Sequence, residues 1–134
     1  MTASITNNTN HDDDAKLIIS VDDFMLTHRY INQALTPEGY RLENFLSAKE
    51  CIKNLRTLSP KLIISDIEMP NMNGLDFIET LKSFEQTENI PIIFLSALFN
   101  QKTKQQAEAL GAAAYITKPF RASELVSIVN TILH

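Results

Sequence analysis

Short apolar runs alternate along the chain with segments in which apolar residues recur at helical spacing. Five runs have the length and apolar character of buried strands, at residues 17–21, 40–46, 62–66, 92–95 and 113–116. Helical periodicity follows each run, over residues 24–35, 47–58, 75–81, 100–110 and 123–132. Strands that are regularly followed by helices are typical of a parallel sheet with right-handed crossovers. We therefore predict an α/β fold of five strands and five helices.

The first predicted helix has a regular apolar stripe. Its members recur three or four residues apart and are Phe24, Thr27, Ile31, Ala34 and Leu35. Pro37 and Gly39 then end the helix. We expect the stripe to be the buried face of this helix.

Two other elements carry less apolar surface than the rest. Residues 40–46 are less apolar than the other runs, which favours a position at the edge of the sheet. The segment 100–110 has little to bury besides Ala107, Ala109 and Leu110, so we expect a loosely held helix there.

Composition limits the chain to one ordinary globular domain. Of the 134 residues, 44% are hydrophobic and 21% are charged, which is enough apolar material for one core. Residues 1–15 are polar and acidic and predict a flexible tail, followed by a domain at 16–134. A formal net charge of -4 argues against direct binding of nucleic acid, which normally requires a basic face.

The sequence has the features of a cytoplasmic protein. Its single cysteine, Cys51, excludes an internal disulfide. No apolar run reaches the length of a membrane span, and the N-terminal residues do not have the basic and apolar regions of a signal peptide. We expect a cytoplasmic location without contact with a membrane.

The most informative segment is residues 62–74, with the sequence LIISDIEMPNMNG. An apolar strand ends there at one carboxylate, Asp66, and Pro70 and Asn71 then predict a turn. The carboxylate is thus expected at the carboxyl edge of a central strand, where open parallel sheets bind ligands. A single aspartate in this position is more often a cap of the next helix or turn.

Polar side chains also follow the other strands. Asp22 and Asp23 follow the first strand, Ser96 the fourth and Lys118 the fifth. Because the carboxyl ends of parallel strands share one edge, these groups can meet Asp66 in a single cleft. Clustered carboxylates repel one another unless a cation is present, and oxygen ligands with room for water suit Mg²⁺. A hydroxyl and an ammonium beside the metal are what a transferred phosphoryl group needs.

Four segments resemble those of the receiver domains of two-component response regulators: IISVDD, LIISDIEMPNMNGLD, IIFLSA and AYITKPF. The resemblance covers residues 16–134. It implies a doubly wound, flavodoxin-like sheet with strand order 2-1-3-4-5, an order for which a receiver protein is itself a known example.

The resemblance also assigns roles to the residues at the strand ends. It implies that Asp66 is the phosphoacceptor and that Ser96 and Lys118 contact the phosphoryl oxygens. It further implies a Mg²⁺ site formed by Asp22, Asp23, Asp66 and the backbone carbonyl of Glu68. The family has a cis peptide bond between Lys118 and Pro119, which directs the lysine into the cleft, and we expect the same bond here.

A route by which the signal leaves the site is implied as well. Ser96 moves toward the phosphoryl group, and Tyr115 turns inward as the aromatic switch residue. The surface that changes is formed by the helix at 100–110, the fifth strand and the last helix. A downstream partner, a fused output domain or a second copy of the domain would dock on that surface.

Two residues after the fourth strand are expected to control the access of water to the phosphoryl group. Ala97 is small enough to leave a route, whereas Leu98 offers no polar group that could orient the water. We expect a phosphoryl lifetime of intermediate length, with the contribution of Glu68 left open.

The predicted function is a phosphorylation-dependent signalling switch. Asp66 takes a phosphoryl group from the phosphohistidine of a sensor histidine kinase or a histidine phosphotransfer protein, in a Mg²⁺-dependent reaction. Such a domain catalyses its own phosphorylation and slow dephosphorylation and is not a turnover enzyme. The sequence leaves open the kinase, the output, the oligomeric state and whether the chain belongs to a larger regulator.

Two other classes of protein share part of this pattern. A haloacid-dehalogenase-like phosphatase uses a nucleophilic aspartate with an acid two residues on, a spacing that Asp66 and Glu68 have, but its nucleophile follows the first strand. A flavodoxin-like cofactor binder needs a phosphate loop after the first strand, where Asp22 and Asp23 would repel phosphate. Both differences favour the receiver domain.

Overall fold

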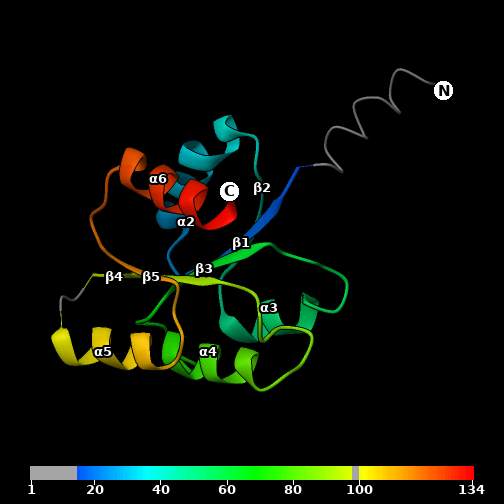
Figure 1. The fold of residues 1–134 in the computed structure, drawn as a ribbon, viewed down its shortest axis with the longest axis vertical. Coiled ribbons are helices and arrows are strands. Elements are labelled where there is room, and N and C mark those ends of the chain that lie inside the picture. Colours follow the sequence, from blue (N-terminus) through cyan, green and yellow to red (C-terminus); the bar gives the residue numbers. More distant parts are fainter. Residues whose placement is uncertain (1–14, 98–99) are drawn as a thin grey trace.

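Five parallel strands form one sheet with helices on both of its faces (Figure 1). The computed structural model describes residues 15–97 and 100–134. The strands are β1 (Leu17–Val21), β2 (Arg41–Phe45), β3 (Leu62–Asp66), β4 (Ile92–Ser96) and β5 (Ala114–Thr117), in the order β2-β1-β3-β4-β5. The predicted α/β fold, the strand order and the edge position of β2 are confirmed.

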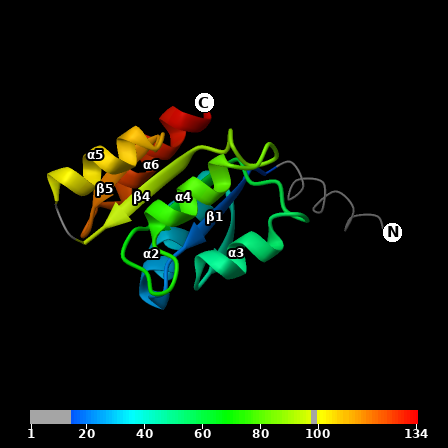
Figure 2. The same cartoon turned by 90° about the horizontal axis from the view of Figure 1, so that it is seen from below.

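The helices form one layer on each face of the sheet (Figures 1 and 2). On one face lie α2 (Met25–Leu35), the short 3-10 helix η1 (Thr36–Glu38) and α6 (Ala122–Leu133). On the other face lie α3 (Ala48–Asn54), α4 (Gly74–Lys82) and α5 (Gln101–Ala109). The carboxyl ends of all five strands therefore meet at one edge, between the two layers.

Alternate residues of the strands fill two separate cores. Ile18 and Ile64 point to the face of α2 and α6, whereas their neighbours Ile19 and Ile63 point to the face of α3, α4 and α5. Successive strand residues face opposite sides of a sheet, so a strand covered on both sides must be apolar throughout. This explains why the three central strands β1, β3 and β4 have unbroken runs of buried residues.

The buried stripe of α2 differs in part from the prediction. Ile31, Ala34 and Leu35 are buried, as expected. Phe24 precedes the helix and is 58% exposed, so its assignment to the buried stripe was wrong. His28 is buried instead, because its ring has hydrogen-bond partners in β1 and in the residue after β1.

The helix predicted at 100–110 has little apolar surface, as expected. Ala107 is the buried residue of α5, and the side chain of Asn100 caps the helix by accepting hydrogen bonds from the Lys102 and Thr103 N–H groups. Its loose attachment to the sheet remains a prediction.

Within the described ranges, none of the helices is both long and apolar enough to cross a membrane. The tail expected at residues 1–15 falls outside these ranges except for Ala15, so its flexibility remains a prediction. Leu98 also lies outside the described residues.

Candidate functional site

Asp66 is the last residue of the central strand β3 and is only 5% exposed. Its neighbours in the sheet are β1 and β4, with Leu95 of β4 directly opposite. The turn expected after the strand is present, since Asn71 has the left-handed φ of 69°. Asn73 then starts α4 by accepting a hydrogen bond from the Asp76 N–H at 2.9 Å. The loop thus connects β3 to α4 and leaves the carboxylate at the carboxyl edge of the sheet.

Gly74 allows α4 to pack directly against the end of β3. A Cβ atom at this position would lie 2.6 Å from the carbonyl oxygen of Asp66 and 2.9 Å from Cε1 of Phe94. Such distances are far below normal contact, so only glycine fits without a shift of the backbone. The sequence shows the glycine, but nothing in the local pattern indicates that the reason for it is close approach to the site.

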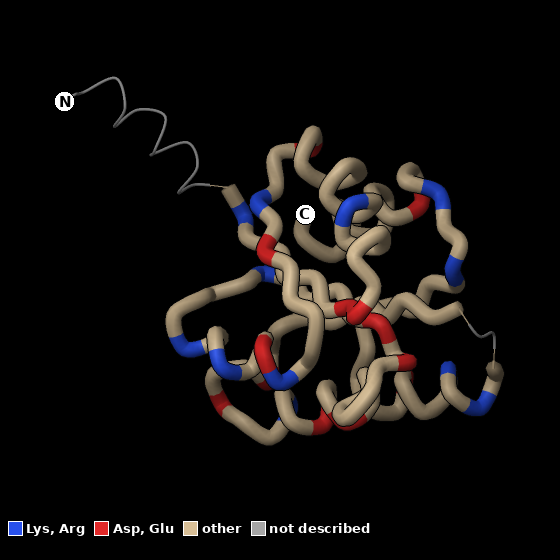
Figure 3. Tube along the Cα trace, turned by 180° about the vertical axis from the view of Figure 1, so that it is seen from behind, with Lys and Arg blue, Asp and Glu red and all other residues tan. Residues whose placement is uncertain are grey.

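Three carboxylates meet at this edge. Asp22, Asp23 and Asp66 each offer an oxygen atom, and these atoms all lie within 4.8 Å of one another. Figure 3 shows one group of acidic positions near the middle of the view, while other acidic positions and the basic positions are spread over the rest of the chain. The convergence that the strand ends predict is therefore present. Hard oxygen donors at this spacing are suited to Mg²⁺.

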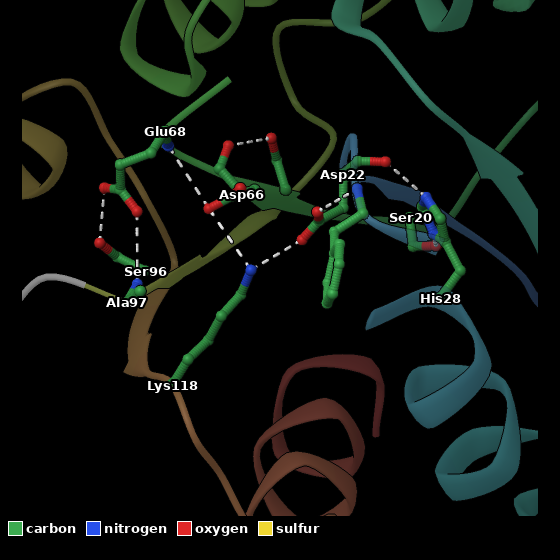
Figure 4. A network of polar contacts seen from close by, with 10 residues as sticks. Ser20, Asp22, His28, Asp66, Glu68, Ser96, Ala97 and Lys118 are labelled. Atoms are coloured by element: carbon green, nitrogen blue, oxygen red, sulfur yellow. Dashed lines mark hydrogen bonds and ion pairs between the residues drawn. The ribbon is translucent and has the colours of Figure 1, made fainter. Parts of the chain in front are cut away.

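Lys118 reaches into the same cluster from the end of β5 (Figure 4). Its Nζ donates a hydrogen bond to Asp22 Oδ2 at 2.8 Å and lies 3.6 Å from Asp66 Oδ1. The peptide bond between Lys118 and Pro119 is cis, as predicted. One ammonium is thus shared between two buried carboxylates.

The pKa of the Asp66 carboxyl is raised from its ordinary value of 3.8 to about 6. Burial is the main cause, and repulsion by the Asp22 carboxylate adds to it. The Lys118 ammonium lowers the pKa, Glu68 raises it, and the hydrogen bond from the Glu68 N–H lowers it. The ionised form of Asp66 is therefore short of compensating positive charge.

Glu68 contacts Asp66 through its backbone and Ser96 through its side chain. Its N–H lies 3.4 Å from Asp66 Oδ1, while its carboxylate accepts a hydrogen bond from Ser96 Oγ at 2.6 Å. The Ala97 N–H donates to the same carboxylate at 3.3 Å. Ser96 lies at the predicted edge, as expected. Sequence reasoning did not identify its contact with the Glu68 side chain, which depends on the path of the loop after β3.

Tyr115 lies in β5 and is half-buried against the core under α3, α4 and α5. A role of Tyr115 and Ser96 as switch residues stays a prediction, and so do the effects of Ala97 and Leu98 on the access of water. The same holds for the backbone carbonyl of Glu68 as a metal ligand.

A buried polar network behind Asp22 was missed by the sequence reasoning. His28 is 2% exposed, and its Nε2 lies 2.7 Å from the carbonyl oxygen of Asp22. Its Nδ1 lies 2.7 Å from Ser20 Oγ, which also accepts a hydrogen bond from Asn44 Nδ2 at 2.6 Å. Because a carbonyl oxygen can only accept, His28 carries a proton on Nε2. A histidine at a helical position one turn before Ile31 was the available signal.

A cleft of about 830 Å³ covers the carboxylates and extends along α2. Besides the site residues, the lining includes the apolar or aromatic side chains of Phe24, Leu26, Tyr30 and Phe120, together with the polar side chains of Thr27, Arg29 and Gln33. Phe24 and Leu26 are each 58% exposed, and the rings of Tyr30 and Phe120 are in contact with centroids 5.2 Å apart. An acidic pocket with one ammonium therefore lies beside an apolar wall.

Comparison with known proteins gives one consistent family. Residues 18–130 match the model of the response regulator receiver domain. The chain is 34% identical over 116 residues to the transcriptional regulatory protein PcoR of Escherichia coli, covering 87% of this chain and 50% of PcoR. It is 29% identical over 119 residues to the chemotaxis protein CheY of Treponema pallidum, covering 87% of this chain and 81% of that protein.

Solved structures agree with the sequence matches. The chemotaxis protein CheY4 of Vibrio cholerae superposes with a TM-score of 0.83 at 25% identity, covering 88% of this chain and 98% of that one. A receiver domain of a histidine kinase from Syntrophus aciditrophicus superposes with a TM-score of 0.82 at 31% identity, covering 89% of this chain and 90% of that one.

The chain spans only part of some of these relatives. It corresponds to half of PcoR and to 7% of the hybrid signal transduction histidine kinase D of Dictyostelium discoideum, to which it is 33% identical over 115 residues. The matches do not support a haloacid-dehalogenase-like phosphatase.

Proposed function

Because the chain belongs to the response regulator receiver domain family, a family of phosphorylation-dependent signalling domains, we propose that Asp66 accepts a phosphoryl group from a phosphohistidine. The donor is a sensor histidine kinase or a histidine phosphotransfer protein. The observation that carries the proposal is the buried Asp66 carboxylate at the end of the central strand, with Lys118 Nζ 3.6 Å from Oδ1 and two further carboxylates beside it.

The acidic cluster fits a magnesium ion. Receiver domains generally bind Mg²⁺ in an acidic pocket, and the raised pKa of Asp66 reflects burial and repulsion that a cation would relieve. The residues that would hold the ion are Asp22, Asp23 and Asp66, with the backbone carbonyl of Glu68. When bound, Mg²⁺ neutralises charge on the carboxylates and on the phosphoryl oxygens.

Asp66, Lys118 and Ser96 have different roles in the proposed phosphoryl transfer. Asp66 supplies the nucleophilic oxygen: an O–P bond forms to it, the P–N bond of the phosphohistidine breaks, and the imidazole leaves with the electron pair. Lys118 compensates negative charge on the phosphoryl oxygens, and Ser96 donates a hydrogen bond to one of them. Water later cleaves the acyl phosphate. The domain is thus its own substrate and not a turnover enzyme.

The apolar wall of the cleft supports a protein as the donor. A phosphohistidine that reaches Asp66 brings the surface around it against Phe24, Leu26 and Tyr30, whose apolar side chains line the cleft. An exposed apolar group of this kind beside a reactive carboxylate is typical of a site for a protein partner.

The output surface in this proposal consists of α5, β5 and α6. Movement of Ser96 toward the phosphoryl group pulls on the chain that leads to α5, and Tyr115 turns inward. The small apolar surface of α5 supports this, since a weakly held element shifts with a small difference in free energy. A downstream protein, a fused output domain or a second copy docks there, in the cytoplasm. Beryllofluoride, a stable phosphoryl mimic, should change amide hydrogen exchange in residues 100–120; changes confined to the surroundings of Asp66 would refute this route.

Incubation with acetyl phosphate and Mg²⁺ tests the function. A receiver gains one phosphoryl group that is stable in acid and cleaved by hydroxylamine. Continuous release of phosphate without a labelled protein would indicate a phosphatase, and the absence of both would exclude phosphoryl chemistry at this site.

A further inference from the structure

The carboxylate of Glu68 is held by two donors from the end of β4. Ser96 Oγ donates to Oε2 at 2.6 Å, and the Ala97 N–H donates to Oε1 at 3.3 Å (Figure 4). Each oxygen of the carboxylate thus has its own donor. Ser96 is fully buried, so its hydroxyl is fixed in position, whereas Glu68 is an exposed residue of the loop after β3.

The same two donors lie where a group on Asp66 would need them. Leu95 pairs with Asp66 across β3 and β4, so Ser96 and Ala97 follow directly beyond the phosphoacceptor on the neighbouring strand. On the other side, Lys118 Nζ is bound to Asp22 at 2.8 Å. A phosphoryl group on Asp66 would bring oxygen acceptors and more negative charge into this space. It would then meet donors that already bind a carboxylate.

We infer that the Glu68 carboxylate is a built-in competitor of the phosphoryl group: it occupies Ser96 Oγ and the Ala97 N–H in the unphosphorylated domain and must leave both before phosphorylation is complete. This inference rests on the proposed function of Asp66. Two charge-assisted hydrogen bonds are lost when Glu68 leaves, and they are replaced by bonds to the phosphoryl oxygens. Glu68 thereby lowers the affinity of the site for a phosphoryl group and stabilises the unphosphorylated position of the chain after β4.

Beryllofluoride binding at fixed Mg²⁺ concentration measures this competition directly. Glu68→Ala removes the carboxylate. Glu68→Asp keeps the negative charge but shortens the side chain by one methylene, about 1.5 Å, so it cannot reach both donors. Glu85→Ala is the matched control, because it removes an exposed carboxylate that lies outside the site.

We expect Glu68→Ala and Glu68→Asp each to bind beryllofluoride about tenfold more tightly than the wild type, the effect expected of one charge-assisted hydrogen bond. Glu85→Ala should bind like the wild type. In a Ser96→Ala background, the increase in beryllofluoride affinity caused by Glu68→Asp should be at least threefold smaller. One of the two donors for which Glu68 and beryllofluoride compete is then absent. A Glu68→Asp variant with wild-type affinity, or an equal gain with and without Ser96, would overturn the inference.

The contact itself can be observed without any ligand. The ¹H–¹⁵N resonance of Ala97 should shift in Glu68→Asp and stay in place in Glu85→Ala, and an unchanged resonance would also overturn the inference. The two claims fail in different ways. Wild-type protein that binds no beryllofluoride would refute the proposed function and this inference with it, whereas equal binding by wild type and Glu68 variants would refute the competition alone.

Discussion

Lys118 Nζ lies 2.8 Å from Asp22 Oδ2 but 3.6 Å from Asp66 Oδ1, so the ammonium is hydrogen-bonded to Asp22 and not to Asp66, the proposed phosphoacceptor. Asp22 is 1% exposed and also accepts a hydrogen bond from the Phe24 N–H at 2.9 Å, which fixes its carboxylate in position. Asp22 thus holds the Lys118 ammonium next to Asp66. A small movement would bring the ammonium to a phosphoryl group added to Asp66.

Replacing Lys118 by methionine removes the ammonium and keeps an unbranched side chain that is one heavy atom shorter. Because this ammonium lowers the pKa of Asp66, the pKa in Lys118→Met should rise above the value of about 6 in the wild type. A ¹³C NMR titration of the Asp66 carboxyl without Mg²⁺ measures it. Lys49→Met, on the exposed surface of α3, is the control. An unchanged pKa in Lys118→Met would show that the ammonium does not act on Asp66.

The raised pKa of Asp66 makes stability depend on pH. Its carboxyl binds a proton more tightly in the folded than in the unfolded chain, where the pKa is near 3.8. The stabilisation of the fold that comes from this tighter proton binding is therefore fully present below pH 3.8 and is lost as the pH rises through about 6. At pH 7 without Mg²⁺, Asp66→Asn should be more stable than the wild type by up to about 3 kcal/mol, at about 1.4 kcal/mol per pKa unit.

Urea unfolding at several pH values tests this. The difference in the free energy of unfolding between Asp66→Asn and wild type should become smaller as the pH falls from 7 toward 4. A constant gap, or a less stable variant at pH 7, would contradict the assigned pKa.

The buried ring of His28 stabilises the fold at the back of the site. His28→Leu keeps an apolar body but leaves the Asp22 carbonyl and the Ser20 hydroxyl without these hydrogen bonds. A buried unpaired polar group costs about 1–3 kcal/mol, so we expect a loss of about 2–4 kcal/mol in the free energy of unfolding. Arg29→Leu, at the next and exposed position, should have little effect. A loss under 1 kcal/mol for His28→Leu would mean that the network does not support Asp22.

Gly74 should tolerate no side chain. Gly74→Ala places a methyl group 2.6 Å from the Asp66 carbonyl oxygen, and we expect a loss of about 1–3 kcal/mol or more from overpacking. Gly39→Ala is a useful comparison, because a Cβ there meets nothing within 4 Å and only the left-handed φ of 94° opposes it. Its cost should be about 1 kcal/mol. Chemical denaturation compares the two: Gly74→Ala should lose clearly more free energy of unfolding than Gly39→Ala, and an equal or smaller loss would exclude close packing as the reason for Gly74.

The sequence predicts the sheet and the strand-end residues because both follow from short-range patterns. Buried parallel strands are apolar throughout, and Asp22, Asp66 and Lys118 each come directly after or at the end of such a run. Contacts that depend on the exact path of a loop are not encoded in this way. The bond between Glu68 and Ser96 is one example.

The burial of His28 in place of Phe24 has a similar explanation. The helical period allows a buried stripe that includes Phe24. His28 is polar, so the pattern of apolar residues does not predict that it is buried. Only the position of Ser20 and of the Asp22 carbonyl in space provides the partners that permit burial of His28. Polar partners outside the helix therefore allow His28 to join Ile31, Ala34 and Leu35 on the inner face of α2.

The most direct measurement of the central claim is the site of phosphorylation. Wild type, Asp66→Asn and Asp76→Asn are each incubated with acetyl phosphate and Mg²⁺, and bound phosphoryl groups are counted by intact mass. We predict one labile phosphoryl group on the wild type and on Asp76→Asn, whose carboxylate lies in the first turn of α4, and none on Asp66→Asn. Full labelling of Asp66→Asn would contradict the assignment of Asp66 as the phosphoacceptor.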